Sequence, residues 1–381
     1  MNKHRMNKEP SSFAALLRFA TARQAQRNEF NGLALELFAL QFQHNPAYRK
    51  ICEARGLTPG VVEHWTQIPT VPTSAFKELE LSCIPPEERT AVFHSSGTTE
   101  QKPSRHFHSA ESLAVYEASL WTWFEQNIFD SRFTIHDSRL VCLTPPPEQA
   151  PHSSLVHMFE TVRRKLGASE SAFVGQIGAD GVWTLDFDAV LAALNSSLVT
   201  RHSSLLLGTA FSFVHLLDNL VERDLRVQLP AGSRVMETGG YKNRSRAMPK
   251  TDLHALITER LGVPRENILC EYGMSELSSQ AYDGVTSDEW QVARNKDSRH
   301  PSPVTRHFRF PSWARAQIIS PETGHEVADG ETGLIRVFDL ANVFSVAAIQ
   351  TEDLGVRRGD GFELIGRAQL SEPRGCSLMT V

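Results

Sequence analysis

The sequence has few cysteines, no long apolar run and no excess of basic residues. Its 381 residues include only five cysteines, and their odd number and scattered positions exclude a disulfide framework. No stretch approaches the ~18 consecutive apolar residues of a membrane-spanning helix, and no apolar segment follows the polar N-terminus as in a signal peptide. Lys and Arg total 39 against 44 Asp and Glu, the opposite of a basic nucleic-acid-binding face. We therefore expect a cytoplasmic protein with no membrane span and no nucleic acid partner.

Several catalytic motifs are also missing. The sequence contains no Gly-x-Ser-x-Gly, no His-Glu-x-x-His and no Gly-x-Gly-x-x-Gly, which argues against a serine hydrolase, a zinc protease and a dinucleotide-binding enzyme. His106 and His108 form a pair, as do His152 and His157, but no cysteine or carboxylate stands at zinc spacing from them. A metal site built on these histidines is therefore disfavoured.

The composition is that of a globular protein with two domains or one large one, since 41% of the residues are hydrophobic and 22% charged. Residues 1–90 are predicted to be a helical N-terminal segment, because Leu33, Leu37 and Leu40 recur at helical spacing. Within this segment the proline-punctuated stretch 68–86 is predicted to be a loop crossing rather than a core element.

Residues 91–305 are predicted to form an α/β core. Short apolar runs such as Leu205–Leu207 end in small or polar residues and lead into helical patterns, as at 211–222 and 252–261, which is typical of a parallel sheet with crossover helices. Ligands of such sheets bind at the carboxyl ends of the strands. Residues 306–381 lose the helical periodicity and show short strands separated by turns, which predicts a β-rich subdomain.

The strongest candidate site is the segment that begins at His94. Polyphosphate needs several hydrogen-bond donors, a backbone free to approach closely and a cation, and this segment supplies all three. Its candidate phosphate-binding residues are Ser95, Ser96, Gly97, Thr98, Thr99 and Lys102. The spacing is not that of a Walker P-loop, and the alternative is an ordinary surface turn rich in serine and threonine.

A second candidate lies at a predicted strand end, in Glu271-Tyr272-Gly273-Met274-Ser275-Glu276. Tyr272 offers a flat face for a purine, Ser275 a donor to phosphate, and Glu276 an oxygen ligand suited to Mg²⁺. Considered alone, the segment is better explained as an exposed acidic turn. Together with the serine- and threonine-rich segment it predicts a nucleotide site.

Two further positions carry weaker signals. The carboxylate of Asp353 is suited to ribose hydroxyls and Arg367 to phosphate or ribose oxygens. Taken singly, Asp353-Leu354-Gly355 is better explained as a hairpin turn. Cys376 stands near the C-terminus beside Arg374, whose charge favours a thiolate. The alternative for Cys376 is an inert thiol, and the other four cysteines are expected to be inert.

In this combination the motifs resemble those of the adenylate-forming enzymes, and most closely their acyl-protein synthetase (LuxE-like, fatty-acid–protein ligase) branch, which is akin to phenylacetate–CoA ligases. The resemblance extends from about residue 40 to the end. Beyond the segments already given, it rests on Ile68–Lys77, Thr238-Gly239-Gly240-Tyr241-Lys242 and Arg374-Gly375-Cys376-Ser377-Leu378.

The resemblance implies a fold like the N-terminal domain of adenylate-forming enzymes, without their small C-terminal lid domain. It implies ATP and Mg²⁺ as cofactors and a carboxylic acid, in this branch a fatty acid, as substrate. Gly239 and Gly240 would pass close to the nucleotide, Ser275 would bind the α-phosphate, and Cys376 would accept the acyl group as a thioester. An acyl reductase or an acyl carrier protein is the implied partner.

Two positions depart from the family pattern. Glu100 stands where many adenylate-forming enzymes have a second loop glycine, and the adenylation lysine of the lid domain is missing, so Lys242 and Lys102 are the candidates for its charge-neutralising role. Two other functions stay open at this point. One is an acyl- or aryl-CoA ligase or an enzyme that loads a carrier protein, and the other is a nucleotide-binding protein without chemistry.

Overall fold

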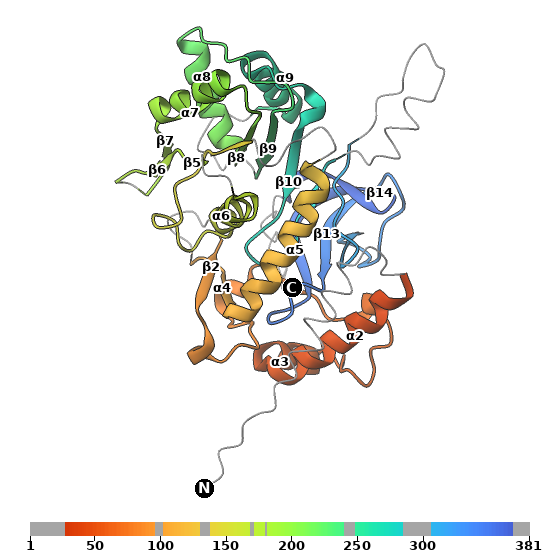
Figure 1. The fold of residues 1–381 in the computed structure, drawn as a ribbon. Coiled ribbons are helices and arrows are strands. Elements are labelled where there is room, and N and C mark those ends of the chain that lie inside the picture. Colours follow the sequence, from red (N-terminus) through yellow and green to blue (C-terminus); the bar gives the residue numbers. More distant parts are fainter. Residues whose placement is uncertain are drawn as a thin grey trace, which may run out of the picture.

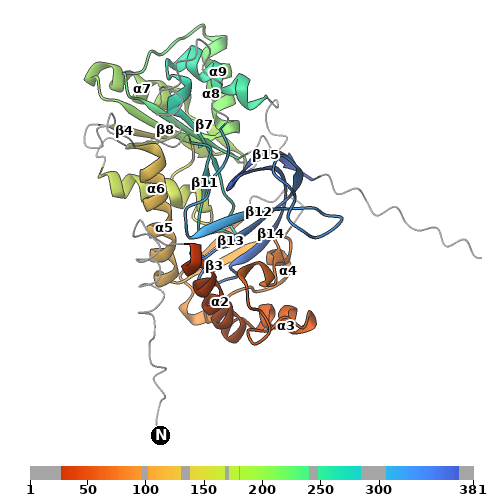
Figure 2. The ribbon, with the colours of Figure 1, turned by 90° about the vertical axis from the view of Figure 1, so that its right-hand side faces the viewer.

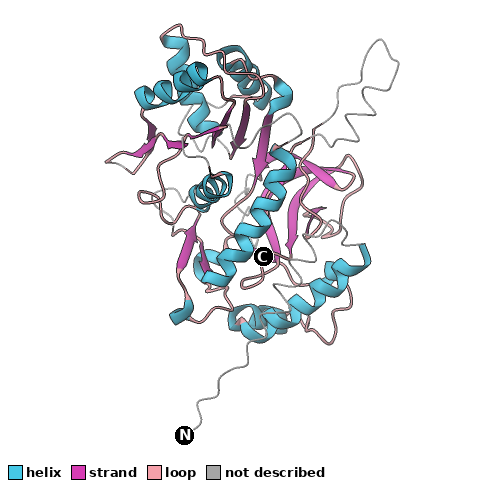
Figure 3. Ribbon diagram, viewed as in Figure 1, coloured by secondary structure: helices cyan, strands magenta, loops and turns pink. Residues whose placement is uncertain are grey.

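A computed structural model describes most of the chain, and Figures 1 and 3 show its helices and strands. The described residues are 27–95, 102–129, 138–167, 171–179, 181–239, 248–284 and 306–368, with side chains from residue 30 onward. Within these ranges the strands form a large, mostly parallel sheet, a mostly antiparallel sheet and two short hairpins. No helix in the described part of the chain is long and apolar enough to cross a membrane.

The larger sheet has the strand order β11-β10-β9-β8-β4-β5. Its strands are β4 (Arg139–Cys142), β5 (Ser171–Phe173), β8 (Ser204–Thr209), β9 (Arg234–Thr238), β10 (Ile268–Tyr272) and β11 (Ala281–Tyr282). Neighbouring strands are parallel except for β11, which runs antiparallel to β10 at the edge. The predicted parallel sheet is therefore confirmed, with a short antiparallel edge strand added.

Helices cover both faces of this sheet (Figure 1). One face packs against α7 (Phe187–Thr200), α8 (Ala210–Glu222) and α9 (Lys250–Leu261), and the other against α5 (Ala110–Ile128) and α6 (Ser154–Leu166). Because side chains alternate along a strand, Val235 and Met236 of β9 belong to the two opposite hydrophobic clusters. Burial on both faces explains why these strands read as continuous apolar runs.

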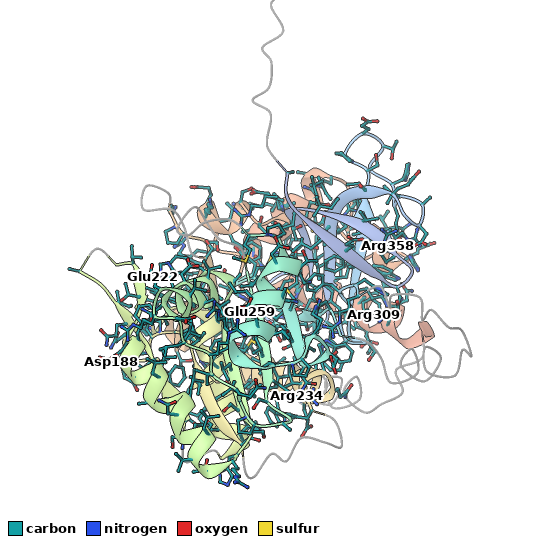
Figure 4. The ribbon with its side chains drawn as sticks, turned by 90° about the horizontal axis from the view of Figure 1, so that it is seen from above. Asp188, Glu222, Arg234, Glu259, Arg309 and Arg358 are labelled. Atoms are coloured by element: carbon teal, nitrogen blue, oxygen red, sulfur yellow. The ribbon has the colours of Figure 1, made fainter. Side chains whose placement is uncertain are left out.

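Charged side chains of the α7–α9 layer lie on the outside of the molecule. Figure 4 shows Asp188, Glu222 and Glu259 on these helices, apart from Arg309 and Arg358 on the side of the second sheet. Arg226 reaches Glu259 at 3.0 Å in an exposed ion pair. The same layer also contacts carboxylates inside the molecule, where α9 places the Lys250 Nζ 2.6 Å from the buried Asp283 Oδ2 and the His254 Nε2 3.1 Å from the buried Glu237 Oε1.

The second sheet has the order β1-β14-β13-β12, with β15 also paired to β14. Its strands are β1 (Val71–Pro72), β12 (Ala314–Ile319), β13 (Thr332–Asp339), β14 (Ala348–Arg358) and β15 (Gly361–Arg367). The helices α2 (Arg27–His44) and α3 (Pro46–Ala54) lie next to it (Figure 2) and contribute to the same hydrophobic cluster as its strands. This arrangement brings the beginning of the described chain against its end.

The stretch 68–86 is not a mere loop crossing, and this prediction was wrong. Val71 and Phe76 are fully buried, and Val71 in β1 pairs in parallel with Ile349 of β14. The stretch also contains a short helix, α4 (Ala75–Glu78). Proline is compatible with an edge strand, where Pro72 has no ladder partner on its outer side, so the prolines did not exclude pairing.

The hairpin-turn alternative for Asp353 was also wrong. Asp353 lies within β14, opposite Arg367 of β15, and the actual turn follows Arg358. Just before β14, which begins at Ala348, the Ser345 hydroxyl donates a hydrogen bond to the Leu81 carbonyl at 2.8 Å.

Two short hairpins complete the described chain. β2 (Ala91–His94) and β3 (Arg105–His108) pair antiparallel, and the serine- and threonine-rich segment connects them. β6 (Gly175–Ile177) pairs with β7 (Trp183–Leu185). Single helical turns are η1 (Trp65–Gln67), η2 (Pro86–Glu88) and η4 (Arg265–Asn267).

Candidate functional site

The two strongest sequence motifs lie in contact. The Oγ of Ser104, at the end of the serine- and threonine-rich segment, lies 3.4 Å from the Oγ of Ser275 in the turn after β10. His106 of β3 lies 2.7 Å from the Ser275 carbonyl through its Nδ1 atom. All three residues are buried. The carboxyl end of β10 and the β2–β3 hairpin therefore meet at one place, although 171 residues separate Ser104 from Ser275 in the sequence.

The structure describes the candidate phosphate loop only at its two ends. The Ser104 amide donates to the Ser95 Oγ at 3.0 Å, which closes the base of the loop. Ser96, Gly97, Thr98 and Thr99 lie outside the described residues. The structure thus fixes where the loop begins and ends, with Ser104 beside Ser275 and Ser95 hydrogen-bonded to Ser104.

The turn itself presents a hydroxyl and a carboxylate together. The Ser275 hydroxyl donates to the Glu276 Oε2 at 3.0 Å, and both side chains are buried. Asn342 donates through Nδ2 to the Glu276 carbonyl at 2.9 Å, which fixes the turn from the side of the second sheet. The predicted α-phosphate and Mg²⁺ ligands are therefore adjacent, in a turn that the Asn342 side chain holds.

The third sequence candidate joins the same turn. The Tyr272 hydroxyl donates to the Asp353 Oδ2 at 2.9 Å, and Arg367 approaches the Asp353 Oδ1 with its Nε at 3.7 Å. Burial raises the pKa of Asp353 and of Tyr272 above their ordinary values, so the phenol keeps its proton and acts as the donor. The Tyr272 ring packs edge-on against Phe362, with centroids 5.2 Å apart. Arg367 is 80% exposed.

Two glycines allow the backbone to turn or approach closely here. Gly239 follows β9 with a φ of 71°, in the left-handed region that favours glycine. A Cβ on Gly273 would lie 2.3 Å from the Glu271 Oε1, so a side chain there would displace this carboxyl group. Gly240 lies outside the described residues.

Glu271 is a site residue to which the sequence analysis gave no role. It is buried at the end of β10, and Thr238 at the end of β9 donates a hydrogen bond to its carboxylate. Burial raises the pKa of Glu271 to about 7, and the nearby Glu237 adds to the shift. The available signal was an acidic residue inside a predicted buried strand, directly before the motif Tyr272–Glu276.

Asp339 is the second residue that sequence reasoning missed. Its carboxylate accepts hydrogen bonds from the Ser279 hydroxyl at 2.7 Å and from the Ser278 amide at 2.9 Å. Burial raises the pKa of Asp339 to about 6. Asp339 ends β13, so the segment after Glu276 is fastened to the second sheet. The available signal was an aspartate directly after the mostly apolar run 334–338.

The candidate catalytic residues are placed unequally. The Lys102 Nζ lies 3.5 Å from the Glu78 Oε2 of α4, and both side chains are largely exposed. Lys242 and Cys376 lie outside the described residues. Burial raises the thiol pKa of Cys52 to about 11 and of Cys83 to about 12, in line with the prediction that these cysteines are inert.

Within the described residues no group of three histidine, cysteine, aspartate or glutamate side chains is arranged to hold a metal ion. Glu276 is thus a single carboxylate candidate. A single carboxylate fits Mg²⁺, which commonly keeps waters and binds protein through one or two carboxylates plus substrate phosphates.

Two known proteins resemble this chain over most of its length. Two "long-chain-fatty-acid–luciferin-component ligases" are each 23% identical to this chain, one from Vibrio harveyi over 364 residues and one from Aliivibrio fischeri over 378 residues. Each match covers 93% of this chain and 88% of the relative.

Solved structures of 2-hydroxyisobutyryl-CoA ligase share the fold. The open conformation in complex with 2-HIB-AMP and CoA has a TM-score of 0.65 at 13% identity and covers 89% of this chain and 69% of the ligase. The postadenylation state with 2-HIB-AMP has a TM-score of 0.64 at 15% identity, covering 89% and 67%. The predicted adenylate-forming α/β fold is thereby confirmed.

The profile of one family, "Acyl-protein synthetase, LuxE", matches residues 15–380. Because the match spans nearly the whole sequence, this chain belongs to the LuxE family of acyl-protein synthetases, as its motifs predicted.

Proposed function

We propose that this chain activates a fatty acid with ATP as an acyl adenylate and then transfers the acyl group to a protein thiol. The observation that carries the proposal is the contact of Ser104 with Ser275 at 3.4 Å, because Ser104 follows the phosphate-loop candidate and Ser275 precedes Glu276 in the turn after β10. The family membership and the names of the two luciferin-component ligases support the fatty acid as substrate.

In the first step a carboxylate oxygen attacks the α-phosphorus of ATP, the bond to the β-phosphate breaks, and pyrophosphate leaves. Residues 95–99 and Lys102 hold the phosphates, and the Ser275 hydroxyl turns from the Glu276 carboxylate to donate to the α-phosphate. Such donors stabilise the charge that spreads over the phosphoryl oxygens in the transition state. Lys242 is the other candidate for neutralising this charge.

The nucleoside end of the site lies beside β14. Asp353 accepts the ribose hydroxyls, and Arg367 reaches ribose or phosphate oxygens. Tyr272 packs beside adenine while its hydroxyl holds Asp353 in place at 2.9 Å. Gly239, Gly240 and Gly273 let the backbone approach the nucleotide.

Glu276 is the residue that would hold Mg²⁺. Its carboxylate lies next to the Ser275 hydroxyl at 3.0 Å, so metal and α-phosphate would be bound side by side. The ion would contribute charge neutralisation at the phosphates.

In the second step a thiolate attacks the carbonyl carbon of the acyl adenylate, the bond to the phosphate oxygen breaks, and AMP leaves. We assign this thiol to Cys376, which yields a thioester on the protein. An acyl reductase or an acyl carrier protein then receives the acyl group, and the reaction takes place in the cytoplasm.

The test uses labelled fatty acids of graded chain length with Mg·ATP. Acid-dependent exchange between ATP and pyrophosphate reports the first step, and a hydroxylamine-labile label on the protein reports the second. Cys376→Ser should abolish the label and keep the exchange, whereas Cys83→Ser should keep both. A label that survives in Cys376→Ser would refute the assignment of the thiol.

A second candidate function is transfer to coenzyme A, favoured by the shared fold with a ligase whose structure contains CoA. Adding CoA, or a carrier protein, to the same assay distinguishes the acceptors by the thioester that forms. A protein without chemistry would show no exchange with any aliphatic or aromatic acid.

A further inference from the structure

His106 lies where the two halves of the candidate site meet. It stands in β3, two residues after Ser104, and its side chain is buried at 3% exposure. Its Nδ1 lies 2.7 Å from the Ser275 carbonyl oxygen. Because a carbonyl only accepts hydrogen bonds, Nδ1 carries the proton and the imidazole is fixed in that tautomer.

The surroundings of His106 hold the ring in one place. Phe76 of α4 approaches the ring edge-on, with centroids 6.3 Å apart, and is itself fully buried. Burial lowers the pKa of His106 to about 4, so the imidazole is neutral in ordinary buffers. The contact with Phe76 thus gives α4, to which the proposed reaction assigns no chemical role, the function of supporting the His106 ring.

The hydrogen bond acts on the one peptide that bears both proposed ligands. The Ser275 carbonyl belongs to the peptide that links Ser275 to Glu276, so fixing its direction fixes how the Ser275 hydroxyl and the Glu276 carboxylate are presented. Reacting groups must be held in place to within fractions of an ångström for phosphoryl chemistry.

We propose that His106 is a positioning residue, which holds the Ser275–Glu276 peptide through Nδ1 so that hydroxyl and carboxylate point together at the α-phosphate and its metal. The inference rests on the proposed function and deepens it. It gives β3, the strand that follows the candidate phosphate loop, the role of holding the turn with Ser275. His106 itself does not touch substrate.

His108 provides a matched control in the same strand. It lies two residues further along β3, on the same face, and is buried like His106. Its Nδ1 contacts the Ser112 hydroxyl at 3.1 Å, at the start of α5, instead of the turn. Burial lowers the pKa of this ring as well. Replacing either ring costs core packing, but only His106 reaches Ser275.

The experiment compares His106→Asn, His106→Gln, His106→Phe and His108→Phe in acid-dependent ATP–pyrophosphate exchange at varied ATP and Mg²⁺. The Asn amide nitrogen occupies nearly the place of Nδ1, whereas the Gln amide nitrogen occupies that of Nε2. We expect His106→Asn to stay within about threefold of wild type, and His106→Gln and His106→Phe to lose roughly tenfold or more in kcat/KM for Mg·ATP. His108→Phe should lower the melting temperature with kcat/KM unchanged.

The outcomes separate the inference from the proposed function. A wild-type protein without exchange for any acid would overturn both. An active wild type in which His106→Gln matches His106→Asn, or in which His108→Phe loses as much kcat/KM as His106→Phe, would overturn the positioning role alone. Should His106→Phe fail to fold, the Asn–Gln comparison decides, because these two variants differ only in the reach of one amide.

Discussion

The Tyr272 hydroxyl donates a hydrogen bond to the Asp353 carboxylate at 2.9 Å, across 81 residues of sequence. Tyr272 ends β10 of the larger sheet, and Asp353 lies in β14 of the second sheet. One side-chain hydrogen bond therefore connects the two sheets at the nucleoside end of the proposed site.

Tyr272→Phe removes this donor and leaves the Asp353 carboxylate free to rotate. We expect the KM for ATP to rise about five- to tenfold, and the protein to lose ~1 kcal/mol of stability, the usual contribution of one hydrogen bond. Exchange kinetics and urea unfolding measure the two effects. Tyr48→Phe is the control, because the Tyr48 hydroxyl donates to the Pro69 carbonyl at 2.7 Å in the core. Equal changes of KM in both variants would contradict the role of Tyr272.

The sequence predicted where the strands of the site lie better than it predicted which distant residues contact one another. Leu205–Leu207 and Ile268–Cys270 were recognisable because strands buried on both faces leave long apolar runs. The pairing of Val71 with Ile349 was not recognisable, because a two-residue edge strand has no periodicity and its partner lies 278 residues away, from 71 to 349. Asp339 and His106 were missed for a related reason, since their roles depend on partners brought in by the fold.

Glu271 makes stability depend on pH. Its pKa of about 7 lies above the ordinary 4.5, so the folded state binds the proton more tightly than the unfolded state. The resulting stabilisation is complete below about pH 4.5 and is lost as the pH rises through about 7. Glu271→Gln should remove this part of the slope, of order 3 kcal/mol at about 1.4 kcal/mol per pKa unit. Urea unfolding from pH 4.5 to 8 measures it, and identical slopes in both proteins would refute the prediction.

Asp339 fastens the segment that follows Glu276. In Asp339→Asn one acceptor oxygen becomes a donor and faces the Ser278 amide or the Ser279 hydroxyl, so we expect a loss of about 1–3 kcal/mol of stability. The displaced turn should also lower exchange activity. Asp360→Asn, which alters a largely exposed partner of Arg309 at 3.2 Å, should change stability by less than about 0.5 kcal/mol. Urea unfolding and the exchange assay follow both variants, and comparable losses would count against Asp339 as a fastening point.

Lys102 and Glu78 form an exposed ion pair, which contributes little to stability. Lys102→Gln and Glu78→Gln should each change the free energy of unfolding by less than about 0.5 kcal/mol. Lys102→Gln should lower ATP–pyrophosphate exchange about 10- to 100-fold, since a charge-assisted contact to phosphate is lost. Glu78→Gln should leave exchange at the wild-type level. Full activity in Lys102→Gln would assign the charge-neutralising role to Lys242.

The pairing of β1 with β14 has a consequence for how the chain is made. During synthesis Val71 is added long before Ile349, so β1 has no partner strand until β14 has been made. Phe30 and Phe76 pack in the same hydrophobic cluster as residues of β12, β13 and β14. In the nascent chain these strands are not yet present to bury them. We therefore expect chaperones to bind the residues around Phe30, Val71 and Phe76 while the rest of the chain is being synthesised.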